Sequence, residues 1–175
     1  KLKAYTSGGK VNRLRVDMGK AILEPKEIPV VLDGDKVVDR PVEIAGKNYN
    51  ITCVSMGNPH CVVFMDDIDN LDIETVGPEF ENDKLFPERV NTEFVTVLDD
   101  HTIKMRVWER GSGETWACGT GACAVAVAAC ENGFCKKGED IKIKLKGGDL
   151  IINYTDETVY MTGNAEKVFE GEVEV

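Results

Sequence analysis

The chain has 175 residues, 42% of them hydrophobic, and a formal net charge of -10 at pH 7. This length and apolar content suit one domain with a sizeable core. The acidic balance argues against nucleic-acid binding, which needs clustered Lys and Arg. The longest apolar stretch, Ala122 to Cys130, is about half of what a membrane span requires. No signal sequence opens the chain. We therefore expect a cytoplasmic protein without a nucleic-acid or membrane partner.

Short strands separated by turns are predicted along most of the chain. Apolar and polar residues alternate in these segments, and Val, Ile, Phe and Tyr are enriched. In chain order the expected strands are Arg13 to Met18, Pro41 to Ile44, Tyr49 to Ser55, His60 to Met65, Glu93 to Leu98, Ile103 to Trp108, Ile141 to Leu145, Leu150 to Tyr154, Val159 to Thr162 and Lys167 to Glu170. A short helix is expected around Ile73 to Glu81, broken by Gly77 and Pro78.

A second helix is predicted from Gly121 to Glu131, ending at Asn132-Gly133, which are residue types typical of a helix C-terminus. Its residues are apolar on every face, so protein must surround it. The small alanine side chains would let strands approach closely. The sequence thus predicts an α+β fold in which a curved or barrel-like sheet wraps around one central apolar helix.

The six cysteines include no Cys-x-x-Cys pair, and His60 and His101 lack the spacing of metal ligands. We therefore predict no metal site. Cys123 and Cys130 fall on one helical face, which fits small buried hydrophobic residues. Reduced thiols in a reducing compartment are the simplest interpretation.

Cys118 stands apart because it lies in a glycine turn directly before the second helix. The first amide N-H groups of a helix have no partners within it, and its dipole places partial positive charge there. Both effects favour a thiolate, so we expect Cys118 to have a lowered pKa and to react faster with alkylating agents than the other cysteines. The alternative is a half-buried structural cysteine.

Other polar residues are expected at the same end of the fold. Gly119 and Thr120 offer backbone N-H groups that could hold an anion such as a carboxylate, although glycine-rich turns are common before helices. Glu109 and Arg110 end a predicted strand, where the alternative is a solvated ion pair.

Two asparagines and a histidine complete the set of candidate residues. Asn58 and His60 lie in a Gly-Asn-Pro-His turn, where Asn58 could be a turn residue and His60 a satisfied polar residue. Asn91 stands at a strand start, where it could be a capping residue.

Three motifs occur together in this sequence. They are Glu109-Arg110-Gly111-x-Gly113-x-Thr115-x-Ala117-Cys118-Gly119-Thr120-Gly121, Met56-Gly57-Asn58-Pro59-His60-Cys61 and Pro87-Glu88-Arg89-Val90-Asn91-Thr92. With them the chain resembles the diaminopimelate epimerase family from about Arg15 to its C-terminus. Members of that family are considerably longer, and their pattern has a second catalytic cysteine upstream in a Cys-Gly-Asn-Gly-x-Arg sequence. That sequence does not occur in these 175 residues.

The resemblance implies the C-terminal half of such an enzyme. Residues 1–17 would be a remnant of a missing N-terminal domain, residues 18–163 the C-terminal epimerase domain, and residues 164–175 a tail strand that packs on the missing domain. Without that domain, Arg13 to Met18 and Lys167 to Glu170 would lack a partner sheet, so we expect them to fray or to pair in a dimer.

The resemblance also implies an isomerase that interconverts LL- and meso-diaminopimelate in lysine and cell-wall precursor synthesis. The family uses two cysteines as acid and base, without pyridoxal phosphate, metal or another cofactor. Implied partners are the substrate, the missing N-terminal domain and a possible second copy in a homodimer. Because only one catalytic cysteine is present, this chain alone is predicted to be inactive.

Site roles follow from the same resemblance. Cys118 would be one of the two catalytic cysteines, with Glu109 tuning it and His60 near a catalytic cysteine. The implied substrate contacts are Asn58, Asn91, Glu109, Arg110, Gly119 and Thr120. Two rival functions stay open: a related cofactor-free racemase acting on proline or hydroxyproline, and a noncatalytic domain that kept the fold.

Overall fold

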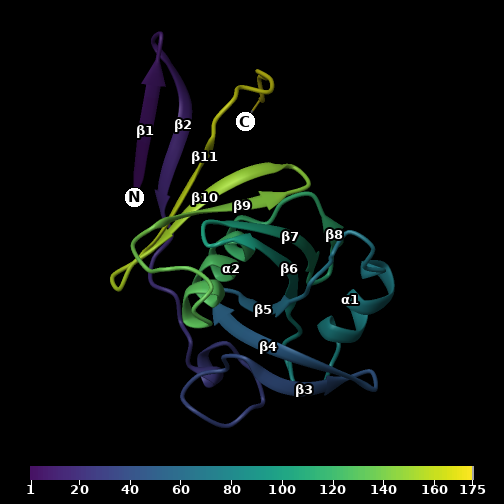
Figure 1. The fold of residues 1–175 in the computed structure, drawn as a ribbon. Helices are drawn as coiled ribbons and strands as arrows, with labels where there is room; N and C mark the ends of the chain where they lie inside the picture. The colour runs from purple at the N-terminus through teal and green to yellow at the C-terminus, as the bar shows by residue number, and fades with distance from the viewer. Residues whose placement is uncertain (175) are drawn as a thin grey trace.

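The structure is a computed structural model that describes residues 1–174. Within these residues, eleven strands form one mixed sheet in the order β1-β2-β11-β10-β9-β7-β6-β5-β4-β3, and β8 pairs with β7 (Figure 1). The strand bounds are β1 Leu2–Ser7, β2 Lys10–Asp17, β3 Arg40–Ile44, β4 Lys47–Ser55, β5 Pro59–Phe64, β6 Asn91–Asp99, β7 Thr102–Glu109, β8 Gly113–Thr115, β9 Asp140–Leu145, β10 Gly148–Tyr154 and β11 Val159–Asn164. Neighbouring strands are antiparallel except β5 with β6 and β7 with β9, which are parallel.

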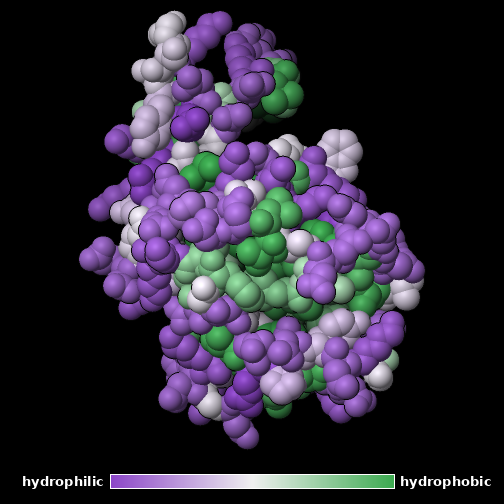
Figure 2. All heavy atoms as spheres, in the orientation of Figure 1, coloured by the Kyte–Doolittle hydropathy of each residue, from purple (hydrophilic) through white to green (hydrophobic). Residues whose placement is uncertain are grey.

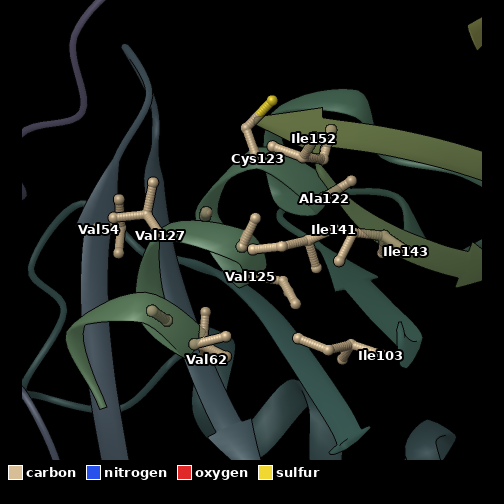
Figure 3. Close-up of a cluster of buried hydrophobic side chains, with 14 of the residues drawn as sticks. Val54, Val62, Ile103, Ala122, Cys123, Val125, Val127, Ile141, Ile143 and Ile152 are labelled. Carbon is tan, nitrogen blue, oxygen red and sulfur yellow. The ribbon is translucent and has the colours of Figure 1, made fainter. Parts of the chain in front are cut away.

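The helix α2, Gly119–Glu131, is the apolar helix predicted from the sequence, and it begins two residues earlier than expected. Its residues from Gly121 to Ala129 are buried, and it contacts β4, β5, β6, β9, β10 and β11. Figure 3 shows Val125 and Val127 of this helix among strand residues such as Val62 and Ile141. The described residues form mostly one mixed sheet with few helices, which confirms the α+β class.

Strands β4 to β6 carry a different core on each face. Val95 of β6 packs in the cluster around α2, whereas its neighbour Phe94 packs in a second cluster with Phe80. Phe80 belongs to the helix α1, Ile73–Glu81, and its ring meets that of Phe94 edge to face with centroids 5.3 Å apart. Because side chains alternate along a strand, each strand presents every second residue to α2.

The predicted break in the first helix is wrong, because α1 runs without interruption and contains Pro78. Gly77 lies against the ring of Trp108, where an added Cβ would come within 2.4 Å of the indole. Buried residues on both sides of Gly77, such as Val76 and Phe80, anchor this segment to the second core. Tertiary packing therefore overrides the local cost of proline.

The N-terminal part of the chain forms a hairpin, β1 with β2, that projects from the body of the protein (Figure 1). The expectation that Arg13 to Met18 would lack a partner is wrong, because β2 pairs with β11, with Arg15 opposite Thr162. The strand predicted at Lys167 to Glu170 is also wrong, since residues 165–174 have no regular secondary structure. Residue 175, the end of the predicted tail strand, lies outside the described residues.

Figure 2 shows hydrophilic side chains over most of the face in view, with hydrophobic ones gathered in the middle of the body below the hairpin. No residue of the two hairpin strands is buried. Neither helix of the described residues is long and apolar enough to cross a membrane.

Candidate active site

Cys118 is the N-cap residue of α2, as its position before the helix predicts. Its backbone is extended, and its Sγ accepts a hydrogen bond from the Gly121 N-H at 3.4 Å. The Thr120 Oγ1 lies 3.6 Å from the same sulfur. Only 6% of Cys118 is exposed. The thiol therefore occupies the position where unpaired helix amides converge.

The predicted lowering of the Cys118 pKa is wrong for this chain. The pKa of the thiol is raised to about 12, mainly by burial and also by the carboxylates of Glu93 and Glu109. The hydrogen bonds from Thr120 and Gly121 act in the opposite direction. Loss of hydration and nearby negative charge outweigh the helix terminus, so Cys118 is a thiol at neutral pH.

Strand periodicity brings three ionisable side chains to the α2 face of neighbouring strands. His60 of β5 lies two residues before the core residue Val62, and Glu93 of β6 lies two residues before the core residue Val95. Glu109 lies two residues after the core residue Val107 on β7. Residues two apart on a strand share a face, so all three lie on the side of the sheet that α2 covers.

A chain of hydrogen bonds connects this face with Cys118. Glu93 Oε1 lies 2.7 Å from His60 Nδ1, and Asn58 Oδ1 lies 3.0 Å from His60 Nε2. Asn58 donates from Nδ2 to Thr120 Oγ1 at 3.3 Å, and Thr120 Oγ1 faces the Cys118 sulfur. The structure thus brings together Asn58, His60 and Thr120, three of the residues that the sequence indicates.

Glu93 belongs to this series of hydrogen bonds but was not predicted from the sequence. The side chain is completely buried, and burial raises the pKa of its carboxyl group. A usable signal existed in the sequence: Glu93 stands two residues before Val95 in a strand of otherwise apolar and small polar residues. A charge at such a position must find a buried partner, and His60 is that partner.

Glu109, Arg110 and Asn91, three further predicted residues, meet at the turn between β7 and β8. Glu109 accepts a hydrogen bond from the Thr115 hydroxyl, and Arg110 donates from Nη1 to the Glu88 carbonyl at 2.8 Å. Asn91 accepts from the Arg110 N-H at 3.0 Å and donates to the Pro59 carbonyl at 2.8 Å. Asn91 therefore ties the start of β5 to this turn.

A second buried carboxylate, Glu81 of α1, fixes the same turn and was also missed. Its Oε1 accepts from the Gly111 N-H and from Arg89 Nη1, each at 2.9 Å, and its Oε2 accepts from Trp108 Nε1 at 2.7 Å. Arg89 has a left-handed φ of 59°, which is uncommon for a side-chain-bearing residue. The Pro-Glu-Arg-Val-Asn segment is thus anchored to the Glu-Arg-Gly turn.

All six cysteines are free. Within residues 1–174, no group of three or more His, Cys, Asp or Glu side chains is arranged to hold a metal ion.

Solved structures share this fold at low sequence identity. A probable proline racemase from Agrobacterium radiobacter aligns with a TM-score of 0.69 over 93% of this chain and 54% of that one, at 15% identity. A hydroxyproline epimerase from Agrobacterium vitis aligns with a TM-score of 0.65 over 92% of this chain and 52% of that one, at 13% identity. At these identities the likeness concerns the fold alone.

The sequence itself matches more specifically. Residues 52–168 match the family model for diaminopimelate epimerase. The enzyme of that name from Agathobacter rectalis is 50% identical over 99% of this chain and 64% of its own length. The one from Acetivibrio thermocellus is 52% identical over 99% of this chain and 62% of its own length. This chain thus spans less than two thirds of the length of these relatives, and by its sequence it belongs to the diaminopimelate epimerase family.

Proposed function

We propose that this chain supplies one half of the active site of a cofactor-independent epimerase that interconverts LL- and meso-diaminopimelate. The observation that carries the proposal is Cys118 at the start of α2, contacted by Thr120 and linked through Asn58 to His60. Relatives named diaminopimelate epimerase, about half identical over nearly all of this chain, support this substrate. The racemase-like structures support only the fold.

The chemistry follows from the weak acidity of the proton on the α-carbon of an amino acid. Inversion without a cofactor requires a base on one face of that carbon and an acid on the other. Cys118 as a thiol donates its proton to the carbanion in one direction. In the reverse direction the thiolate removes the proton, so the sulfur alternates between two protonation states and no electrons are transferred.

Substrate charges compensate for the raised thiol pKa. An α-ammonium group near Glu109 offsets the negative charge that raises the pKa of Cys118. The α-carboxylate fits the N-terminus of α2, where the N-H groups of Gly119 and Thr120 stabilise the charge that develops as the proton leaves. Asn58, which is hydrogen-bonded to Thr120, is proposed to contact the substrate, as are Arg110 and the Asn91 side chain that accepts from the Arg110 N-H.

The second acid or base is proposed to come from an upstream segment of the full protein. The chain spans 64% and 62% of the length of two relatives, and two-base inversion needs a group on the other face. We propose residues 18–163 as the C-terminal epimerase domain, with residues 1–17 and 164–175 contacting an N-terminal domain. The exposed Val168 and Phe169 suit such a contact. The proposal includes a sheet that wraps around α2, a homodimer and a cytoplasmic role in lysine biosynthesis.

The test compares the 175-residue chain with the same chain joined to the N-terminal part of the Agathobacter rectalis relative that lies outside the matched 64%. Each is incubated with LL-diaminopimelate and, separately, with L-proline, and the stereoisomers are separated. We expect conversion of diaminopimelate only, and only by the joined protein. Conversion of proline would favour the racemase. A well-folded joined protein that converts neither substrate would favour a noncatalytic domain, and turnover by the short chain would remove the need for a second half.

A further inference from the structure

Glu93 is a completely buried carboxyl group without a place in the mechanism above. Its Oε1 meets His60 Nδ1 at 2.7 Å, and no group of the described residues hydrogen-bonds its Oε2. A Cβ added at Gly121 would lie 2.6 Å from Glu93 Oε1 and 3.2 Å from the Cys118 sulfur. The carboxyl group therefore lies directly beneath the first turn of α2, and only glycine at 121 leaves room for it.

The hydrogen bonds that connect Glu93 with Cys118 have a defined direction. Asn58 turns its oxygen to His60 Nε2, so that nitrogen must carry a proton. The amino group of Asn58 donates to Thr120 Oγ1. Because Thr120 accepts this bond, its single O-H is free to donate to the Cys118 sulfur. With Nε2 protonated, the contact between Glu93 and His60 Nδ1 contains one further, shared proton.

Loss of that shared proton exchanges donor and acceptor in every hydrogen bond from His60 Nε2 to Cys118. The remaining ring proton of His60 must then sit on Nδ1 to donate to the Glu93 carboxylate, and Nε2 becomes an acceptor. Asn58 has to present its amino group to Nε2 and its oxygen to Thr120. The Thr120 hydroxyl then donates to Asn58 and offers a lone pair to Cys118, an arrangement that suits a thiol.

We propose that Glu93 is a positioning residue that sets the direction of these hydrogen bonds through His60 and Asn58. It thereby determines whether Thr120 stabilises the thiolate or the thiol of Cys118. Its use in catalysis rests on the proposed function, because only an acid or base at Cys118 needs both forms. The coupling between Glu93 and Cys118 does not require bound substrate. Glu93 has no hydrogen bond to Cys118 or to Thr120, so its effect on Thr120 passes through His60 and Asn58.

Other ionisable groups also face these two residues. Glu109 of β7 raises the pKa of both Glu93 and Cys118. Burial raises the pKa of Cys123 in α2 and of Cys61 in β5, so both are thiols near neutral pH and add no charge there. The sign is therefore clear. As pH rises and the shared proton is lost, net negative charge at Glu93 and reversal of Thr120 both raise the pKa of Cys118.

The Glu93→Gln variant isolates this effect. A carboxamide carries no charge and has no proton to lose near neutral pH, and it can donate an N-H to His60 Nδ1 while Nε2 keeps its proton for Asn58. We expect the pKa of Cys118 to fall and its alkylation by iodoacetamide at neutral pH to rise about three- to tenfold, since each unit of pKa changes the thiolate fraction about tenfold. Nitrogen-15 NMR of His60 reports the tautomer directly.

Thr120 variants separate bond direction from charge. Thr120→Val removes the hydroxyl, so alkylation of Cys118 should slow, whereas Thr120→Ser should keep the rate of the unchanged chain. In the Thr120→Val background, Glu93→Gln should accelerate alkylation far less than it does alone. If the two substitutions instead act independently, the effect of Glu93 is charge alone and the proposal is overturned.

Glu131→Gln is the matched control, because Glu131 is a paired carboxylate at the opposite end of α2, about 18 Å away by helix rise. It should change neither the His60 tautomer nor the rate. A His60 ring that carries its only proton on Nδ1 at every pH tested in the unchanged chain would contradict the proposal. If Glu93→Gln fails to fold, the Thr120→Val and Thr120→Ser pair still decides, since equal rates overturn it. None of these measurements uses substrate, so an inactive epimerase would leave them unaffected.

Discussion

His60 Nδ1 lies 2.7 Å from Glu93 Oε1, and both side chains are completely buried. The two residues come from β5 and β6, which are parallel neighbours in the sheet. Burial of either polar group alone is costly, whereas the pair shares its charge and its hydrogen bond. The contact is therefore both a structural requirement and the base of the hydrogen-bond chain to Cys118.

Removal of the imidazole leaves the Glu93 carboxyl group buried without its partner. We expect His60→Ala to lower the free energy of unfolding by about 3–5 kcal/mol, the usual cost of breaking a buried pair. Urea denaturation at pH 7 measures the change. His101→Ala is the matched control, because His101 is half exposed and such surface changes usually stay within about 0.5 kcal/mol. Equal effects of the two substitutions would contradict the buried pair.

The raised pKa of Cys118 predicts a slow thiol. With a pKa of about 12, the thiolate is a minor species at pH 7. The alkylation rate should rise with pH up to that value, by at most about tenfold per pH unit and by less where the proton shared by Glu93 and His60 is lost. Cys123 and Cys130 also have raised pKa values of about 12, so Cys118 should not be distinguished by acidity. Peptide mapping after timed alkylation checks this, and a rate that levels off near pH 7 would show a low pKa instead.

Gly121→Ala should disrupt the site, because the new Cβ would lie 2.6 Å from Glu93 Oε1. Overpacking of this kind costs about 1–3 kcal/mol of stability. Gly119→Ala provides the comparison in the same turn of α2, since its Cβ would meet only the flexible end of Met161 at 3.2 Å. Thermal or urea unfolding of both variants measures the difference. A Gly121→Ala chain as stable as the Gly119→Ala chain would mean that Glu93 can move aside freely.

Glu81 anchors the turn that carries Arg110, so its loss should loosen that turn. Glu81→Ala leaves Trp108 Nε1 and the Gly111 N-H without their acceptor, at a cost of about 1.5–3 kcal/mol for each charge-assisted bond. Hydrogen exchange at the Gly111 amide should become faster. Glu79→Ala on the exposed side of the same helix should leave that exchange unchanged, and an equal change in both variants would argue against the anchor.

Part of this architecture could be read from the sequence. The apolar run that ends at Asn132-Gly133 predicted α2, and Asn132 is indeed its C-cap, followed by Gly133 with a φ of 79°. Alternation predicted most strands. The strands β1 and β8 were missed because the first is almost entirely exposed and the second has three residues, so neither has an apolar pattern.

The failures at the site share one physical cause. The expected thiolate at Cys118 rested on the helix terminus alone, whereas burial and the neighbouring Glu93 come from segments distant in sequence. Glu93 itself pairs with His60, a residue 33 positions earlier, because β5 and β6 are parallel. Local patterns carry no information about such a pairing, and they identify a buried charge only as one that needs a partner.

The most direct test of the central claim, that Cys118 exchanges a proton with the α-carbon, is solvent deuterium incorporation into diaminopimelate by the joined protein described above. Cys118→Ser keeps the size of the side chain and removes the acidic thiol. Cys130→Ser is the matched control at the other end of α2. We predict that Cys118→Ser abolishes detectable epimerisation and removes deuterium incorporation at one face, while Cys130→Ser incorporates deuterium as the unchanged protein does. Undiminished epimerisation by a folded Cys118→Ser protein would contradict the account.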